Sequence, residues 1–124
     1  MTVEIPEDAG EMLEEEYHEP DETHWVVEEM PVFPNGQAAL LRFLTTNLNY
    51  PPDAVQKNIQ GQVVCQFTVN KDGSISDIEV VSGVNPSLDK EALRVLQMMP
   101  HWTPGKRQGK TVKVRYTLPI DFRL

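Results

Sequence analysis

The stretch from Thr68 to Glu79 carries oxygen-bearing side chains at spacings that resemble a calcium-binding loop. If Thr68 is counted as position 1, ligand positions 3, 5, 9 and 12 of such a loop are occupied by Asn70, Asp72, Ser76 and Glu79. Gly73 occupies position 6, where the loop requires glycine. The loop also requires an anionic ligand at position 1 and an amphipathic helix on each side. Thr68 does not supply that ligand, so the flanking sequence has to decide.

Apolar residues recur at every second position on both sides of the central Asn70–Gly73. They are Val63, Cys65, Phe67 and Val69 before it and Ile78 and Val80 after it. A period of two with β-branched residues favours strands. The Asn, Asp and Gly between them favour a tight turn, because Asn and Asp side chains bond nearby backbone and Gly adopts positive φ. We therefore expect a hairpin with strands at about 62–70 and 74–82, and no metal or cofactor.

Charge is distributed unevenly along the 124 residues. The net charge is −8, but residues 1–30 hold twelve of the nineteen acidic residues and none of the eleven Lys and Arg. That segment, with charge −12, has too little apolar surface to offset its ordering entropy. We expect residues 1–30 to be an acidic, mostly disordered tail or linker, in which only HWVVEEM (24–30) could dock as a short strand. Residues 31–124, with charge +4, should form one folded domain.

Composition disfavours several classes of protein. No run of about eighteen apolar residues, as a transmembrane helix requires, is present, and no segment resembles a signal peptide. The single cysteine, Cys65, excludes an internal disulfide and a multi-cysteine metal site. Because Cys65 falls on the apolar face of a predicted strand, we expect a buried, unreactive thiol.

Three helices are predicted around the hairpin. The first is capped by Asn35 and ends before Tyr50-Pro51-Pro52, because proline cannot continue a helix. A short second helix covers about 53–58. The third begins at Asn85 or Ser87 and carries an apolar stripe made of Leu88, Ala92, Val95, Leu96 and Met99.

Residues 111–124 form the clearest strand. Its apolar face consists of Val112, Val114, Tyr116, Leu118, Ile120, Phe122 and Leu124. A slip by one residue would expose all of them, which fixes the register. Pro119 lacks an amide hydrogen, so the strand should lie at a sheet edge, at least there. The order α-α-β-β-α-β predicts an α+β fold with a three-stranded antiparallel sheet packed on helices.

Catalysis and nucleic-acid binding are both weakly supported. No nucleophile elbow, phosphate-binding glycine loop or paired-histidine metal motif is present, so we do not expect an enzyme. A basic cluster that could attract phosphates consists of Lys106, Arg107, Lys110, Lys113 and Arg115. The aromatic residues of the last strand lie on its apolar face, so no exposed stacking platform and no nucleic-acid partner are expected.

Trp102 follows a predicted helix end and lies between Pro100 and Pro104. We expect it to cover one end of the core while its indole N–H donates to a carbonyl, rather than to bind a ligand.

From about Asn35 to Leu124 the sequence resembles the C-terminal domain of the TonB family of periplasmic energy transducers. The segments that carry the resemblance are YPPDA, GQVVCQFTVNKDGSISDIEVVSG, PSLDKEAL, MPHWTPG and YTLPIDFRL, in this order. The resemblance implies a periplasmic domain that grips the TonB box, a short N-terminal peptide of outer-membrane receptors. A motor of the ExbB and ExbD type, driven by the proton gradient, would supply the energy to import siderophores, vitamins or glycans.

In that family the receptor peptide adds as a strand beside the last strand of the sheet, near the Tyr-Pro element. The resemblance therefore implies a partner-peptide site at Tyr50, Pro51, Thr111, Val112, Lys113, Val114, Arg115, Tyr116 and Thr117. Lys113 and Arg115 would favour acidic peptides. A homodimer is left open.

Two departures from a complete transducer leave the role open. The membrane helix and the long Pro-rich spacer of a complete transducer are not found in these residues. The chain could be a fragment of a protein tethered to the inner membrane, or a standalone relative. The same domain also occurs appended to membrane sensor proteins, where it need not power import. The receptor and the nutrient are not specified by the sequence.

Overall fold

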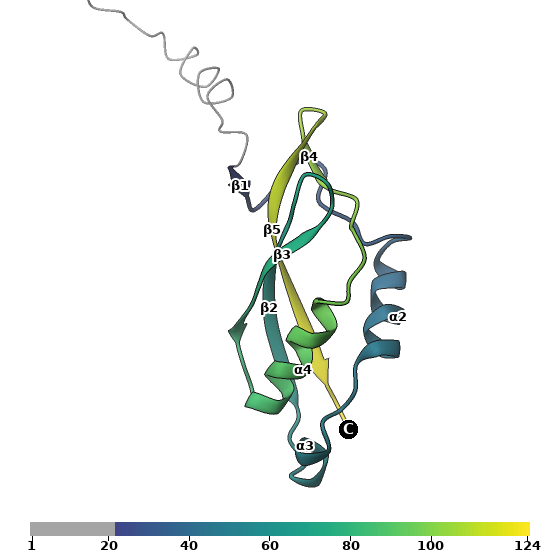
Figure 1. Ribbon diagram of the computed structural model, residues 1–124, viewed down its shortest axis with the longest axis vertical. Helices are drawn as coiled ribbons and strands as arrows, with labels where there is room; N and C mark the ends of the chain where they lie inside the picture. Colours follow the sequence, from purple (N-terminus) through teal and green to yellow (C-terminus); the bar gives the residue numbers. More distant parts are fainter. Residues whose placement is uncertain (1–21) are drawn as a thin grey trace, which may run out of the picture.

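The computed structural model describes residues 22–124 (Figure 1). Most of the segment expected to be disordered, residues 1–21, lies outside the described part of the chain. The elements of the described part are β1 (Thr23–His24), α2 (Gln37–Asn47), α3 (Pro52–Gln56), β2 (Gly61–Val69), β3 (Ile75–Ser82), α4 (Pro86–Leu96), β4 (Gly105–Arg107) and β5 (Lys110–Phe122). None of the helices between residues 22 and 124 has the length and hydropathy needed to cross a lipid bilayer.

Three antiparallel strands, in the order β5-β2-β3, form the centre of the sheet. β2 pairs with β3 as a hairpin, and all of β2 pairs with β5, from Gly61 opposite Phe122 to Val69 opposite Val114. The α+β class and the predicted order of helices and strands are confirmed. Two short strands extend the sheet, because β1 pairs with β5 in parallel and β4 pairs with it antiparallel.

The hairpin interpretation of the stretch after Thr68 is also confirmed. Asn70 donates its amide hydrogen to the carbonyl of Ser74 (2.8 Å), and Gly73, with φ of +88°, donates to the carbonyl of Asn70 (2.9 Å). The Asp72 carboxylate accepts hydrogen bonds from the amide and the hydroxyl of Ser74 at 2.9 and 2.6 Å. The oxygens that a calcium loop would turn towards an ion therefore close the turn instead.

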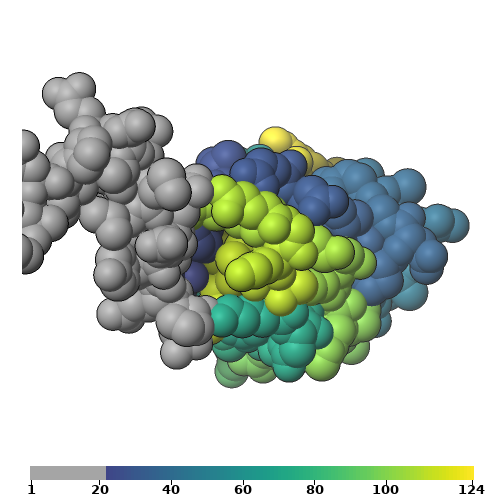
Figure 2. All heavy atoms as spheres, turned by 90° about the horizontal axis from the view of Figure 1, so that it is seen from above, coloured from purple at the N-terminus to yellow at the C-terminus, as the bar shows by residue number. Residues whose placement is uncertain are grey.

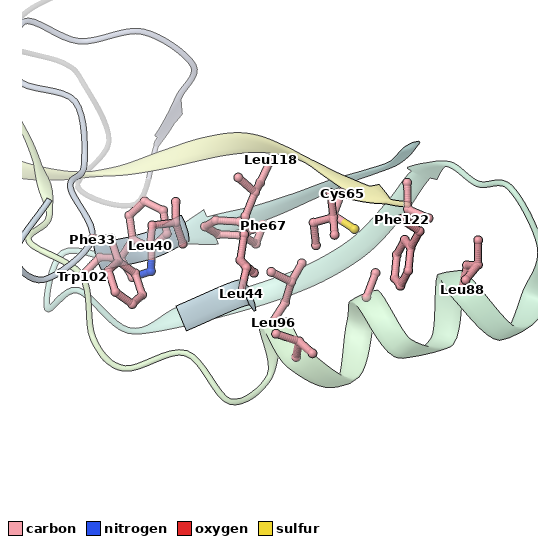
Figure 3. Packing of buried hydrophobic residues seen from close by; sticks show 14 of the residues in the cluster. Phe33, Leu40, Leu44, Cys65, Phe67, Leu88, Leu96, Trp102, Leu118 and Phe122 are labelled. Carbon is pink, nitrogen blue, oxygen red and sulfur yellow. The ribbon is translucent and has the colours of Figure 1, made fainter. Parts of the chain in front are cut away.

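Helices α2 and α4 contribute side chains to one core against the sheet (Figure 3). The buried residues include Leu40 and Leu44 from α2, Leu88 and Leu96 from α4, and Phe67 and Phe122 from the sheet. Each such side chain contributes roughly 1.5–3 kcal/mol when buried. The amide of Ser87 donates to the Asn85 side chain (2.8 Å), which confirms Asn85 as the cap of α4.

The alternation predicted for β5 is confirmed in its central part. Val114, Leu118, Ile120 and Phe122 are buried, whereas Thr117, Pro119 and Asp121 are exposed. At the two ends the apolar face is less covered: Val112 is half-buried and Leu124 is 57% exposed. Both residues lie beyond the part of β5 that pairs with β2.

Cys65 is buried in the middle of β2, as the sequence predicts. Desolvation, with a smaller contribution from the negative charge of Asp89, raises the pKa of the thiol to about 11. Since the thiolate is the reactive form, burial keeps this cysteine unreactive at neutral pH.

One local expectation is wrong. Asn35 does not cap α2, which begins after Gly36 without a side-chain cap; Asn35 itself has φ of +68° in the preceding turn. Part of the segment 24–30, which the sequence allowed to dock as a short strand, contacts the domain, because Glu29 and Lys106 exchange backbone hydrogen bonds of 3.2 and 2.8 Å.

Candidate functional site

β5 has two edges, and the pairing of Val114 distinguishes them. Val114 pairs with Val69 of β2 and also with His24 of β1. At any residue, each of the two edges of a strand can pair with only one neighbouring strand, so β1 and β2 must lie on opposite sides of β5. We call the side of β5 that pairs with β2 the inner edge and the opposite side the outer edge.

The outer edge is paired over a very short length. β1 covers it only at Lys113 and Val114. From Arg115 to Phe122, no strand of the described residues pairs with this edge. Unpaired N–H and C=O groups in an extended strand are a template for another strand. Pro119 lies within this stretch, and the expectation that β5 is a sheet edge there is confirmed.

The segment that follows β1 crosses to the far side of β4. In Figure 1, β1 lies to the left of β5 and β4 to its right, and Figure 2 shows the described N-terminal residues, in purple, against the yellow-green end of the β4–β5 hairpin. Glu29 pairs with Lys106, and Val32 and Thr103 exchange backbone hydrogen bonds of 3.0 and 2.8 Å. The carboxylate of Glu28 accepts a hydrogen bond from the amide of Gln108 (2.8 Å).

Tyr50 and Pro51 lie at the other end of β5. The Tyr50 ring packs edge-on against Phe122, with centroids 5.7 Å apart, and its hydroxyl donates to the carbonyl of Ile59. Both residues line a groove of about 620 Å³ between the α2–α3 connection and α4. The groove is lined by Asn49, Tyr50, Pro51, Pro52, Ser87, Lys90, Glu91, Leu93, Arg94 and Gln97.

One ion pair on α4 holds the Tyr50 turn in place. Arg94 donates two hydrogen bonds to the Glu91 carboxylate, both 2.7 Å, and a third to the carbonyl of Asn47 (2.8 Å). Glu91 in turn accepts a hydrogen bond from the amide of Asn49 (2.6 Å). The hydrogen bonds from Arg94 lower the pKa of the Glu91 carboxyl, and the same contact raises the pKa of the Arg94 guanidinium.

The structure separates the two parts of the predicted partner-peptide site. Thr111–Thr117 occupy the first half of β5, whereas Tyr50 and Pro51 lie near Phe122 at its end. At about 3.3 Å per residue, Thr111 and Phe122 are about 36 Å apart along the strand. The unpaired part of the outer edge, Arg115–Phe122, connects the two.

The basic cluster does not form one exposed surface. Arg115 donates to the Glu79 carboxylate (2.7 Å), the carbonyl of Asp77 (2.6 Å) and the hydroxyl of Thr68 (3.1 Å). Its charge is therefore paired on the side of the inner edge, where β2 and β3 lie. Of the two cations expected to attract acidic peptides, only Lys113 lies beside the outer-edge strand β1.

Trp102 is part of a buried aromatic group at the turn end of the sheet (Figure 3). It makes edge-on contacts with Phe33, Phe67 and Tyr116, with centroids 5.7, 5.3 and 5.0 Å apart. Its backbone amide donates to the carbonyl of Gly73 (2.8 Å), which ties the segment after α4 to the hairpin turn. The expectation that its indole N–H donates to a carbonyl is wrong, because Nε1 has no partner among the described residues.

Sequence reasoning missed the Glu91–Arg94 pair and the outer-edge residues after Thr117. The spacing of an acid three positions before an arginine on α4 is a signal for the pair. For Leu118–Phe122, Pro119 was the available signal, because proline favours strand edges. No group of three or more His, Cys, Asp and Glu that could hold a metal is found between residues 22 and 124.

The fold and the site define a small α+β domain in which one strand of the sheet keeps an open edge. The chain belongs to the TonB C-terminal family. The family model described as Gram-negative bacterial TonB protein C-terminal matches residues 46–124, from the end of α2 to the C-terminal residue.

Individual relatives agree with this assignment. The chain is 33% and 32% identical over 82 residues to Protein TonB from two strains of Helicobacter pylori, J99 and 26695. The match covers 65% of this chain but only 28% and 27% of those proteins. Two solution structures of the Helicobacter pylori TonB C-terminal domain match 68% of this chain with TM-scores of 0.53 and 0.55, at 27% and 28% identity, and are covered over 77% and 89% of their length.

Proposed function

We propose that this chain is the receptor-binding domain of a TonB-type energy transducer in the periplasm. It binds the TonB box of outer-membrane receptors as an added β-strand and passes on energy from a proton-driven motor of the ExbB and ExbD type. The motor acts through an inner-membrane segment outside these 124 residues. Family membership supports a role in energy transduction and transport through protein–protein contacts rather than catalysis.

The observation that carries the proposal is the outer edge of β5. Main-chain pairing with an extended peptide gives affinity without demanding one sequence, and pockets beside the strand supply specificity. The row of backbone N–H and C=O groups open to such a peptide begins after Val114 and continues to Phe122. A peptide bound there, and extended over Thr111–Thr117, would have its other end near Tyr50 and Pro51.

The affinity for an isolated peptide should be weak. About five new backbone hydrogen bonds at about 0.5–1.5 kcal/mol each amount to a few kcal/mol. Ordering the peptide and losing its translational freedom cost a comparable amount, so we expect a Kd on the order of micromolar or weaker. A weak contact suits a coupling that must be released after each transport event.

The test is a titration of isotope-labelled full chain with a synthetic peptide that carries the TonB box of an outer-membrane receptor. We expect amide shifts along β5 from Thr111 to Phe122 and at Tyr50. The control is the same peptide with alternate residues replaced by proline, which cannot add as a strand. Shifts confined to the other open edge, at Ile75–Ser82, or no shifts at millimolar peptide with an intact fold, would overturn the proposal.

A further inference from the structure

We propose that the segment Glu22–Val26, which contains β1, is a built-in competitor for the outer edge of β5 and must leave it before a partner peptide can bind across Lys113 and Val114. This inference rests on the proposed function. It states that a segment of this same chain occupies part of the proposed peptide site when no peptide is bound. The positions that β1 covers lie inside Thr111–Thr117, the part of β5 expected to receive the peptide.

The β1 end of the segment is weakly held. It has only two residues in register with β5, Thr23 with Lys113 and His24 with Val114. The two residues that follow are mostly exposed, Trp25 by 58% and Val26 by 82%. Detaching β1 together with these two residues exposes little further apolar surface, and local opening of this kind is expected at the low end of the stability range.

The residues that follow this segment, 29–33, are firmly anchored. Glu29 and Val32 each exchange two backbone hydrogen bonds, with Lys106 and Thr103 respectively. Beyond them Phe33, 7% exposed, packs against Phe43 and Trp102 in the core. Residues 22–26 can therefore leave β5 while residues 29–33 stay in place, so that the segment opens and closes without unfolding the domain.

Competition follows from the geometry of a strand edge. The N–H and C=O groups that Lys113 and Val114 direct to the outer edge can pair with one neighbour at a time. A peptide strand that crosses these residues must displace β1, and its apparent affinity is reduced by the fraction of molecules in which the edge is free. Because β1 is joined to the anchored residues by a few amino acids, it also returns rapidly when the peptide leaves.

The experiment compares three full-length chains: the native sequence, the double variant Thr23→Pro/His24→Pro, and the control Val26→Pro. The double variant removes the amide hydrogens that β1 needs for pairing. Val26 is exposed and lies outside the paired residues, so the control places proline in the same segment without breaking the pairs. Each chain is titrated with the TonB-box peptide, and the amide signals of residues 22–33 and 110–122 are followed.

We expect the double variant to bind the peptide about three- to tenfold more tightly than the native chain, with the control unchanged. In the native chain, saturating peptide should move the signals of residues 23–26 to the positions they have in the double variant, while those of residues 29–33 stay fixed. Core signals such as those of Phe67 and Val95 check that all three chains are folded.

Two results would overturn the inference while leaving the proposed function intact. One is equal peptide affinity in all three chains. The other is a complex in which residues 23 and 24 remain paired with β5, because the peptide then binds only beyond Val114. A third result, no peptide binding to any of the folded chains, would overturn the proposed function and the competition together.

Discussion

The two edges of β5 are built from the same thirteen residues and differ in everything that surrounds them. The inner edge pairs with β2 from Val114 to Phe122, and β2 in turn pairs with β3. One face of these strands packs on a core of aromatic and aliphatic side chains. The outer edge pairs with two residues of β1. One strand can therefore be fixed by its buried face and inner edge while its outer edge stays available, since side-chain burial and backbone pairing use different directions of the strand.

Substitution of the two tryptophans should give the largest difference in the free energy of unfolding between the two edges. Trp102 is 3% exposed beside the aromatic residues of the inner-edge strands, and Trp25 is 58% exposed on the outer-edge segment. We expect Trp102→Ala to lower the free energy of unfolding by about 3–5 kcal/mol, because it removes a large buried ring. Trp25→Ala should change it by no more than about 0.5 kcal/mol. Chemical denaturation measures both, and comparable losses would contradict the distinction between the edges.

A pair of glycines gives the next largest effect. A Cβ at Gly73 would lie 2.0 Å from the backbone oxygen of Trp102, and φ there is +88°. At Gly109, in the β4–β5 turn, φ is +77° but nothing lies within 4 Å. We expect Gly73→Ala to cost about 3 kcal/mol, from a backbone clash added to the left-handed strain. Gly109→Ala should cost about 1 kcal/mol from strain alone.

Thermal or denaturant unfolding of the two glycine variants distinguishes these contributions. If Gly73→Ala were no more costly than Gly109→Ala, the contact between the hairpin turn and the segment after α4 would not be a fixed part of the fold.

The Glu91–Arg94 pair tests whether the Tyr50 end of β5 is held more firmly than the β1 end. The pKa of Glu91 is lowered in the folded state, chiefly by Arg94. Its contribution to stability is therefore present above the ordinary pKa of 4.5 and is lost as the pH falls through the lowered value. We expect Glu91→Gln to cost about 1 kcal/mol at pH 7 and much less at pH 3.

Unfolding curves of the native chain and of Glu91→Gln at several pH values measure this difference. Arg94→Met should give a similar loss at pH 7, because it removes the same pair from the other side. A difference between native chain and Glu91→Gln that stays constant from pH 7 to pH 3 would show that the ionised carboxylate does not hold the Tyr50 turn.

Hydrogen exchange of the native chain compares the two edges of β5 directly and needs no substitution. Successive residues of a strand direct their amides to opposite edges. Between Arg115 and Phe122, the amides directed to β2 should exchange slowly and those directed to the outer edge should exchange fast. The amides of Val64–Val69 in β2 are the internal control, because this part of the strand lies between β3 and β5 and is paired on both edges. Uniformly slow exchange along β5 would mean that its outer edge is covered.

Local sequence patterns determined most of the sheet and its helices. The alternation in Val112–Phe122 identified the buried face of β5, because a period of two can bury only one set of side chains. Asn70, Asp72 and Gly73 predicted the turn, because their preferences act within a few residues. The stripe on α4 and its cap at Asn85 were likewise local features. The family resemblance implied a site at Tyr50 and Pro51, but it did not reveal their distance from Thr111.

Only the tertiary structure decided what lies on each edge of β5. Pairing of β1 with Lys113 and Val114 joins segments about ninety residues apart through backbone hydrogen bonds. Because nearly every residue type has the same backbone groups, such pairing leaves no pattern in the sequence. The close contact of Gly73 with Trp102 and the hydrogen bond from Asn49 to Glu91 are also long-range. The sequence by itself determined which face of each strand is buried, since burial depends on side-chain chemistry. The neighbours of an edge depend on where the rest of the chain is placed, and that was decided by the packing of the whole domain.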